Sequence, residues 1–159
     1  MSESYDILMG FKSTLDKMVG DLAGDLSTAV STARPVRFYD LDDNEGSREF
    51  QASVDHALVY QYLTLADDPR HPLYEAQFLV GAKTTNDAGN YDMTTLLGDV
   101  RNVFGPGMYY DIADWSGAYA PAERLGSMMI IDAVPTGQQF ENQAGIRMLQ
   151  ITAKVMADG

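Results

Sequence analysis

Residues 74–83 read YEAQFLVGAK, and this stretch decides the fold. Apolar residues occupy every second position, namely Tyr74, Ala76, Phe78, Val80 and Ala82. Successive side chains of a strand point to opposite faces of a sheet, so a period of two predicts a strand with one face in the core. The segments on either side must then supply neighbouring strands and a layer that covers the apolar face.

Six further segments have the composition of strands. Two of them, 57–65 and 128–134, are apolar on both faces, which predicts interior strands. Another, 50–54, alternates Phe50, Ala52 and Val54 with polar residues, which predicts a half-buried strand. The full set of additional predicted strands is 36–39, 50–54, 57–65, 108–112, 128–134 and 147–155.

Two segments have the period of helices. No proline occurs between residues 5 and 33, and apolar residues recur there at steps of three and four, including Leu8, Leu15 and Leu22. We therefore predict a helix over 4–33 that packs by this side on the sheet. A second helix is predicted over 91–104, capped by Asn90 or Asp92 and ended by a Gly-Pro pair.

The order of these segments predicts the fold class. Adjacent strands joined by short loops favour a mostly antiparallel sheet. We therefore predict an α+β fold, with a long N-terminal helix and a second helix packed on one face of the sheet. We find no repeat and no linker, so residues 1–159 are expected to form a single domain.

Composition disfavours several classes of protein. The formal net charge is −12, with only 11 lysines and arginines, so tight binding to nucleic acid or to an anionic membrane surface is not expected. The chain has no cysteine, which excludes disulfides and cysteine-ligated metals. The first residues are polar and acidic, so we expect no secretory signal, and no apolar run is long enough to span a membrane.

The sequence offers little catalytic chemistry. Its two histidines, His56 and His71, have no recognisable catalytic neighbours, and no G-x-S-x-G elbow is present. We therefore expect a protein that is not an enzyme and uses no cofactor, and we predict no hydrolytic or redox activity that depends on either histidine. A triad assembled from distant residues stays open, because its members need not be neighbours in sequence.

One segment partly matches a calcium loop. Asp40, Asp42 and Asn44 have the spacing with which such a loop begins. The match then fails, because Glu45 stands where glycine is needed and Gln51 stands where glutamate is needed. A solvated acidic turn is the favoured interpretation, and a metal site at these three residues is the weak alternative.

A candidate interface lies before the last predicted strand. The segment after the break at residues 135–137 is polar and contains one large apolar residue, Phe140. A phenylalanine on a polar arm can anchor an interface, although it can also fold back on the core. The candidate interface residues are Gln138, Gln139, Phe140, Glu141 and Asn142.

The chain resembles the tail-terminator and tail-completion proteins of long-tailed bacteriophages. The resemblance is carried by the N-terminal helix followed by Val36-Arg37-Phe38, by Phe78-Leu79-Val80-Gly81, by the helix at 91–104, by Ile112-Ala113-Asp114-Trp115-Ser116, and by the closing pair 126–135 and 145–155, joined through Glu141-Asn142-Gln143. It covers most of the chain in order and size. The acidic turn at 40–45 and the loop at 115–125 have no counterpart in it.

The resemblance implies a structural role in the virion. It implies a subunit, made in the host cytoplasm, that forms a hexameric ring in the phage neck, caps the tail tube and joins it to the head. Its partners would be copies of itself, the tail tube protein and head–tail connector proteins, while DNA passes through the ring without specific binding. The alternatives are another head–tail connector subunit, or a small α+β ligand-binding or hydrolytic domain.

Overall fold

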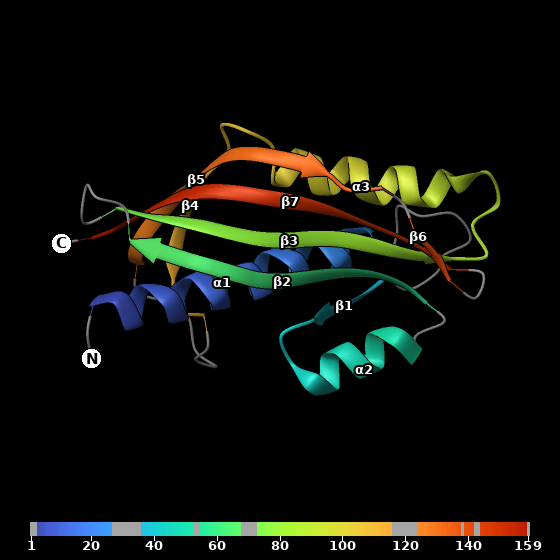
Figure 1. Ribbon diagram of the computed structural model, residues 1–159, viewed down its shortest axis with the longest axis horizontal. Coiled ribbons are helices and arrows are strands. Elements are labelled where there is room, and N and C mark those ends of the chain that lie inside the picture. Colours follow the sequence, from blue (N-terminus) through green and yellow to red (C-terminus); the bar gives the residue numbers. More distant parts are fainter. Residues whose placement is uncertain are drawn as a thin grey trace.

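The computed structural model describes residues 3–26, 36–52, 55–67, 73–115, 124–137, 139–141 and 144–158. The fold is α+β, as the sequence predicts (Figure 1). In chain order its elements are α1 (Glu3–Leu26), β1 (Val36–Asp40), α2 (Asn44–Ala52), β2 (His56–Asp67), β3 (Leu73–Thr85), the 3-10 turn η2 (Ala88–Asn90), α3 (Tyr91–Val103), β4 (Tyr109–Ala113), β5 (Arg124–Pro135), β6 (Gln139–Glu141) and β7 (Ala144–Ala157).

The strands form one sheet in the order β1-β2-β3-β7-β5-β4, and β6 pairs with the start of β7. All pairs are antiparallel except β1 with β2, which run parallel. The strand that the 74–83 pattern predicts is β3, and it pairs along its whole length with β7, from Leu73 opposite Met156 to Thr85 opposite Ala144. The predicted antiparallel sheet is therefore confirmed, with one parallel strand at its edge.

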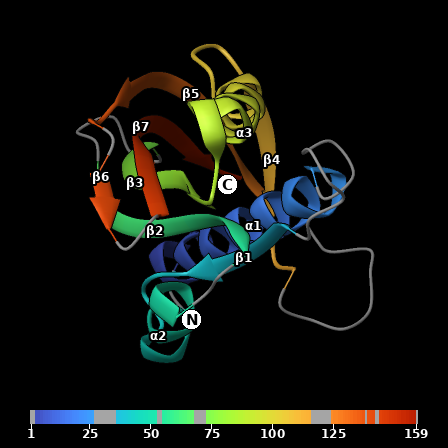
Figure 2. The same ribbon diagram turned by 90° about the vertical axis from the view of Figure 1, so that its right-hand side faces the viewer.

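The sheet curls so that α1 and α3 lie on its inner side (Figure 2). One buried stripe of α1 faces the sheet, consisting of Ile7, Phe11, Leu15, Val19, Ala23 and Leu26. Leu15 is fully buried, as predicted, whereas Leu8 and Leu22 are only partly buried. The buried stripe follows steps of four residues from Ile7 to Ala23 and a last step of three to Leu26, so it passes beside those two leucines. Residues 27–33 of the predicted helix lie outside the described residues.

The first helix contacts both edges of the curled sheet. At the β4 edge, the Thr14 hydroxyl donates to the carbonyl oxygen of Ala113 at 3.1 Å and accepts from its N–H at 3.2 Å. Gly10 allows this close approach, because a Cβ there would lie 2.6 Å from Leu125 Cδ1. At the other edge, the Phe38 ring of β1 lies against Gly20. An edge strand has unpaired N–H and C=O groups that can pair with a strand of another chain. The contact with α1 covers these groups at the end of β4.

The strand predicted at 50–54 is wrong, because most of this segment belongs to the helix α2. The Asp43 carboxylate accepts the N–H of Gly46 at 3.3 Å, which caps the helix at its start. The buried side chain of Phe50 packs with Ala57 and Val59 on the outer face of the sheet. Helices therefore cover both faces, and α2 lies opposite α1 and α3 (Figure 2).

Two further predictions need correction. Asn90 does occupy the N-cap position of α3, but its side chain makes no capping hydrogen bond. The Asp87 carboxylate instead accepts the N–H groups of Asp92 and Met93, at 3.0 and 2.8 Å. The segment 128–134 is not buried on both faces as predicted, since the side chains of Met129 and Ile131 are exposed. No helix among the described residues is long and apolar enough to cross a membrane.

Candidate functional site: a hollow over the edge strand β1

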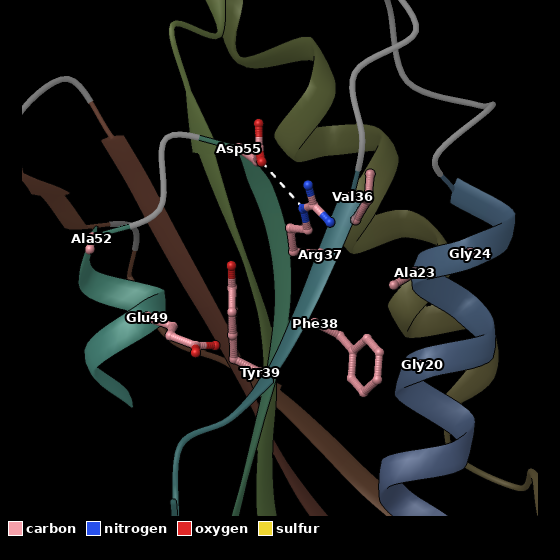
Figure 3. A pocket seen from close by; sticks show the side chains of 10 residues that line it. All are labelled: Gly20, Ala23, Gly24, Val36, Arg37, Phe38, Tyr39, Glu49, Ala52 and Asp55. Atoms are coloured by element: carbon pink, nitrogen blue, oxygen red, sulfur yellow. Dashed lines mark hydrogen bonds and ion pairs between the residues drawn. The ribbon is translucent and has the colours of Figure 1, made fainter. Parts of the chain in front are cut away.

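A hollow of about 710 Å³ lies over β1, between α1 and α2 (Figure 3). We call it the β1 hollow. Its floor is the edge strand itself, and its walls are the last turns of α1 and of α2. The lining residues are Gly20, Ala23, Gly24, Val36, Arg37, Phe38, Tyr39, Glu49, Ala52 and Asp55.

The side chains of β1 divide between the two walls. Val36 and Phe38 face α1, and Val36 belongs to the main core. Tyr39 faces α2, where its ring packs edge-on against Phe50 with 6.2 Å between ring centroids. Phe38 keeps 42% of its surface exposed, which is high for an aromatic residue beside a helix. The hollow therefore presents apolar surface next to a strand edge.

The charged groups of the β1 hollow are unequally paired. The Arg37 guanidinium binds the Asp55 carboxylate, with 3.3 Å between Nε and Oδ2 (Figure 3). Glu49 is exposed on α2, and its carboxylate has no ion-pair partner among the described residues. One positive and two negative groups line the hollow, so its net formal charge is negative.

A second hollow, of about 580 Å³, lies beside the middle of α1, near Asp40 at the end of β1. Here the Tyr60 hydroxyl donates to Asp16 at 2.7 Å, and the Lys17 ammonium lies 4.8 Å from the centre of the Trp115 ring. Burial, followed by the hydrogen bond to Asp16, raises the pKa of Tyr60 above its ordinary value. Tyr60 is thus a hydrogen-bond donor at neutral pH and not a base.

The weak metal candidate consists of Asp40, Asp42 and Asn44, and the structure places a lysine at the first two. The Lys12 ammonium lies 3.3 Å from the Asp40 carboxylate and 3.0 Å from that of Asp42. Burial lowers the pKa of Lys12, but the hydrogen bond to Asp42 and the charges of both carboxylates outweigh it and leave that pKa raised. Asn44 begins α2. No group of three or more acidic or histidine side chains suited to a metal occurs in the described part of the chain.

We predict that this turn does not bind calcium tightly, because the lysine already supplies the positive charge. Isothermal titration of the native chain should give no heat of binding at micromolar calcium. The matched variant is Lys12→Met, which frees the two carboxylates and tests whether the lysine is the reason. Micromolar binding in the native chain that disappears in Asp42→Ala would contradict the prediction.

The two histidines have different positions. His56 is fully buried at the start of β2, and His71 lies outside the described residues. The Thr85 N–H donates to His56 Nδ1 at 3.3 Å, which assigns the ring proton to Nε2, 2.8 Å from Asp92 Oδ2. His56 has no recognisable partner near it in the sequence, and its partner in the structure lies 36 residues away. Its zero exposure leaves the ring no contact with solvent.

The candidate interface segment pairs with the last strand. The backbone of Gln139–Glu141 forms β6, with Gln139 opposite Ile146 and Glu141 opposite Ala144. The segment is therefore part of a hairpin and not a separate arm. Gln138 and Asn142 lie outside the described residues, and so do the side-chain positions of 139–141.

An apolar surface that the sequence did not predict lies on two neighbouring strands. Four exposed residues of β4 and β5, which we call the β4–β5 stripe, are Tyr109, Met129, Ile131 and Val134. Tyr109 lies directly opposite Met129, and the exposed fractions of the four range from 42% to 56%. Their apolar character suggests burial, but in the structure they are exposed and lie outside the core.

The comparison with known proteins bears on the fold of this chain and not on its function. No family model and no curated protein matches the chain. Eleven chains of solved structures match it. One of them, whose name carries no functional information, has a TM-score of 0.53 and 11% identical residues over 94% of each chain. At this identity the likeness shows a shared fold across nearly the whole domain.

Proposed function

We propose that this chain is a structural subunit of a phage neck, where it forms a ring that caps the tail tube and joins it to the head. The observation that carries the proposal is the β4–β5 stripe. Exposed apolar side chains that lie together on a domain surface mark sites of protein–protein contact. Ring contacts are heterologous, so each subunit must present such a surface to a different surface of its neighbour.

Three further features support a structural role. The segments that resemble tail-terminator proteins include the long first helix and the closing strands, and these form α1, β5 and β7 in one sheet-and-helix core. The net charge of −12 suits a ring through which DNA slides, because negative groups repel phosphates. His56, the histidine among the described residues, is buried. The raised pKa of Tyr60 keeps its phenol protonated at neutral pH.

The proposal is tested by reconstitution with tail tubes and electron microscopy. We expect a six-fold ring at one end of the tube. A double variant, Ile131→Lys with Val134→Lys, should lose the ring, because two charges would have to be buried at the contact. Its melting temperature should stay close to that of the native chain, since both positions are exposed.

The matched control is Asn102→Lys, which adds a positive charge at an exposed position on α3. This variant should assemble normally. A native protein that never decorates tube ends would refute the neck role. If the double lysine variant forms normal rings, the β4–β5 stripe is not the contact surface.

A further inference from the structure

We infer that the second hollow is an anchor site for an arginine side chain of a partner protein. We call it the Trp115 hollow, and its lining residues include Met9, Asp16, Lys17, Tyr60 and Trp115. Arginine and tryptophan are among the residues that contribute most to binding energy at protein interfaces. None of these residues belongs to the β4–β5 stripe, so the site can exist with or without the ring proposed above.

The indole of Trp115 supplies an aromatic surface in the wall of the hollow. The Trp115 N–H donates to Ser13 Oγ at 3.0 Å, which attaches its backbone to α1. The residue keeps 38% of its surface exposed. Its ring already attracts a cation, because the Lys17 ammonium lies 4.8 Å from the ring centre. An arginine suits such a ring, since its planar guanidinium can stack on an aromatic face.

The two lysines of the Trp115 hollow are already paired with carboxylates. The Lys12 ammonium lies 3.3 Å from the carboxylate of Asp40 and 3.0 Å from that of Asp42. The Lys17 ammonium lies 2.7 Å from the carboxylate of Asp21. A phosphate or another anionic ligand would have to compete with these aspartates for both lysines. The hollow is therefore poorly suited to an anion.

Asp16 is the carboxylate of the hollow that lacks a cation. Its Oδ1 accepts the Tyr60 hydroxyl at 2.7 Å, and it forms no ion pair with any described residue. The phenol of Tyr60 is protonated at neutral pH, so this hydrogen bond holds the carboxylate in place. Asp16 is exposed, and its Oδ2 accepts no hydrogen bond from the described residues. That oxygen can accept an N–H of an incoming guanidinium.

Charge and apolar surface together favour arginine as the occupant. Among the described residues, the two lysines are outnumbered by four carboxylates in and beside the hollow, those of Asp16, Asp21, Asp40 and Asp42. Met9 lines the same hollow and is 40% exposed, so it can contact the methylene groups of an arginine. The formal charge of −12 attracts a basic partner and repels a second copy of this chain.

The test uses the fluorescence of Trp115, which is the only tryptophan of the chain. The full chain is titrated at low ionic strength with the peptide acetyl-Gly-Arg-Gly-amide, because salt weakens exposed charge pairs. We expect a saturable change in fluorescence. The control peptide carries citrulline in place of arginine, which keeps the shape of the side chain and removes its charge. It should give no saturable change.

Two variants should shift the dissociation constant of the arginine peptide in opposite directions. Asp16→Asn removes the charge and keeps an oxygen for the Tyr60 hydroxyl, so binding should weaken about threefold. Lys17→Met removes the internal cation that competes for the Trp115 ring, so binding should tighten about threefold. The matched control is Glu49→Gln, which removes one negative charge at an exposed position on α2. Its dissociation constant should stay close to that of the native chain.

Several results would overturn the inference. These are the absence of a saturable change, an equal response to the citrulline peptide, undiminished binding by Asp16→Asn, and weaker binding by Lys17→Met. A saturable response to inorganic phosphate, with none to the arginine peptide, would show that the hollow takes an anion. If sedimentation shows that the native chain self-associates and that Asp16→Asn does not, the arginine comes from a second copy, and the separate basic partner is refuted.

Discussion

Replacing Leu15 with aspartate is expected to unfold the domain. Leu15 has no exposed surface and lies in the middle of α1, which packs against both edges of the curled sheet. A carboxylate at this position would have to be buried without a partner, and an uncompensated buried charge costs several kcal/mol or more. Domains of this size are stable by only about 5–15 kcal/mol, so the variant should have little folded population left.

The measurement is thermal denaturation followed by circular dichroism, with Met9→Asp as the control. Met9 lies on the same helix, is apolar and is 40% exposed, so the same substitution there leaves its charge in water. The control should melt within a few degrees of the native chain. Equal melting temperatures for the two variants would contradict the placement of α1 in the core.

Strong local periodicity is what made much of the fold predictable. In β3, one apolar set recurs at every second position, and each of its members, Tyr74, Ala76, Phe78, Val80 and Ala82, is buried in the structure. Leu15 was placed correctly for the same reason, because a long proline-free segment repeats its apolar positions over several turns. Such a pattern reflects the burial of one face of the segment, so it can be recognised from the sequence of that segment alone.

A short segment has too few apolar positions for its periodicity to distinguish a helix from a strand. In α2, Phe50 is the one large buried side chain, so its sequence fits a strand as well as a helix. What favours the helix is the Asp43 cap at its start and the contact of Phe50 with Val59 on β2. That second contact depends on where β2 lies, and the parallel pairing of β1 with β2 also depends on tertiary structure.

The candidate site was hidden for a related reason. The β1 hollow joins residues of α1, β1 and α2, and it exists because β1 is an edge strand. A sequence shows that Gly24 lacks a side chain, but it does not show that the glycine lines a hollow beside β1. The β4–β5 stripe is similar, since Ile131 has the character of a core residue and only the folded sheet shows that it is exposed.

The hydrogen bond between His56 and Asp92 gives the other prediction with a large effect. The pair joins the start of β2 to the first turn of α3, and both residues are buried. Removing one partner by His56→Leu or Asp92→Leu takes away a hydrogen bond to a charged group, which contributes about 1.5–3 kcal/mol. Each single variant should therefore lose at least that much unfolding free energy in a urea titration.

The double variant decides whether the loss comes from the pair itself. When both residues become leucine, neither polar group has to be buried without the other, so the double variant should be less destabilised than the sum of the single variants. Residues in direct contact show coupling energies of about 0.5–3 kcal/mol in such cycles. Additive losses would mean that the bond is not important and that each residue acts through its other contacts. A coupled pair would give His56 a structural role in attaching α3 to the sheet, which fits its lack of solvent exposure.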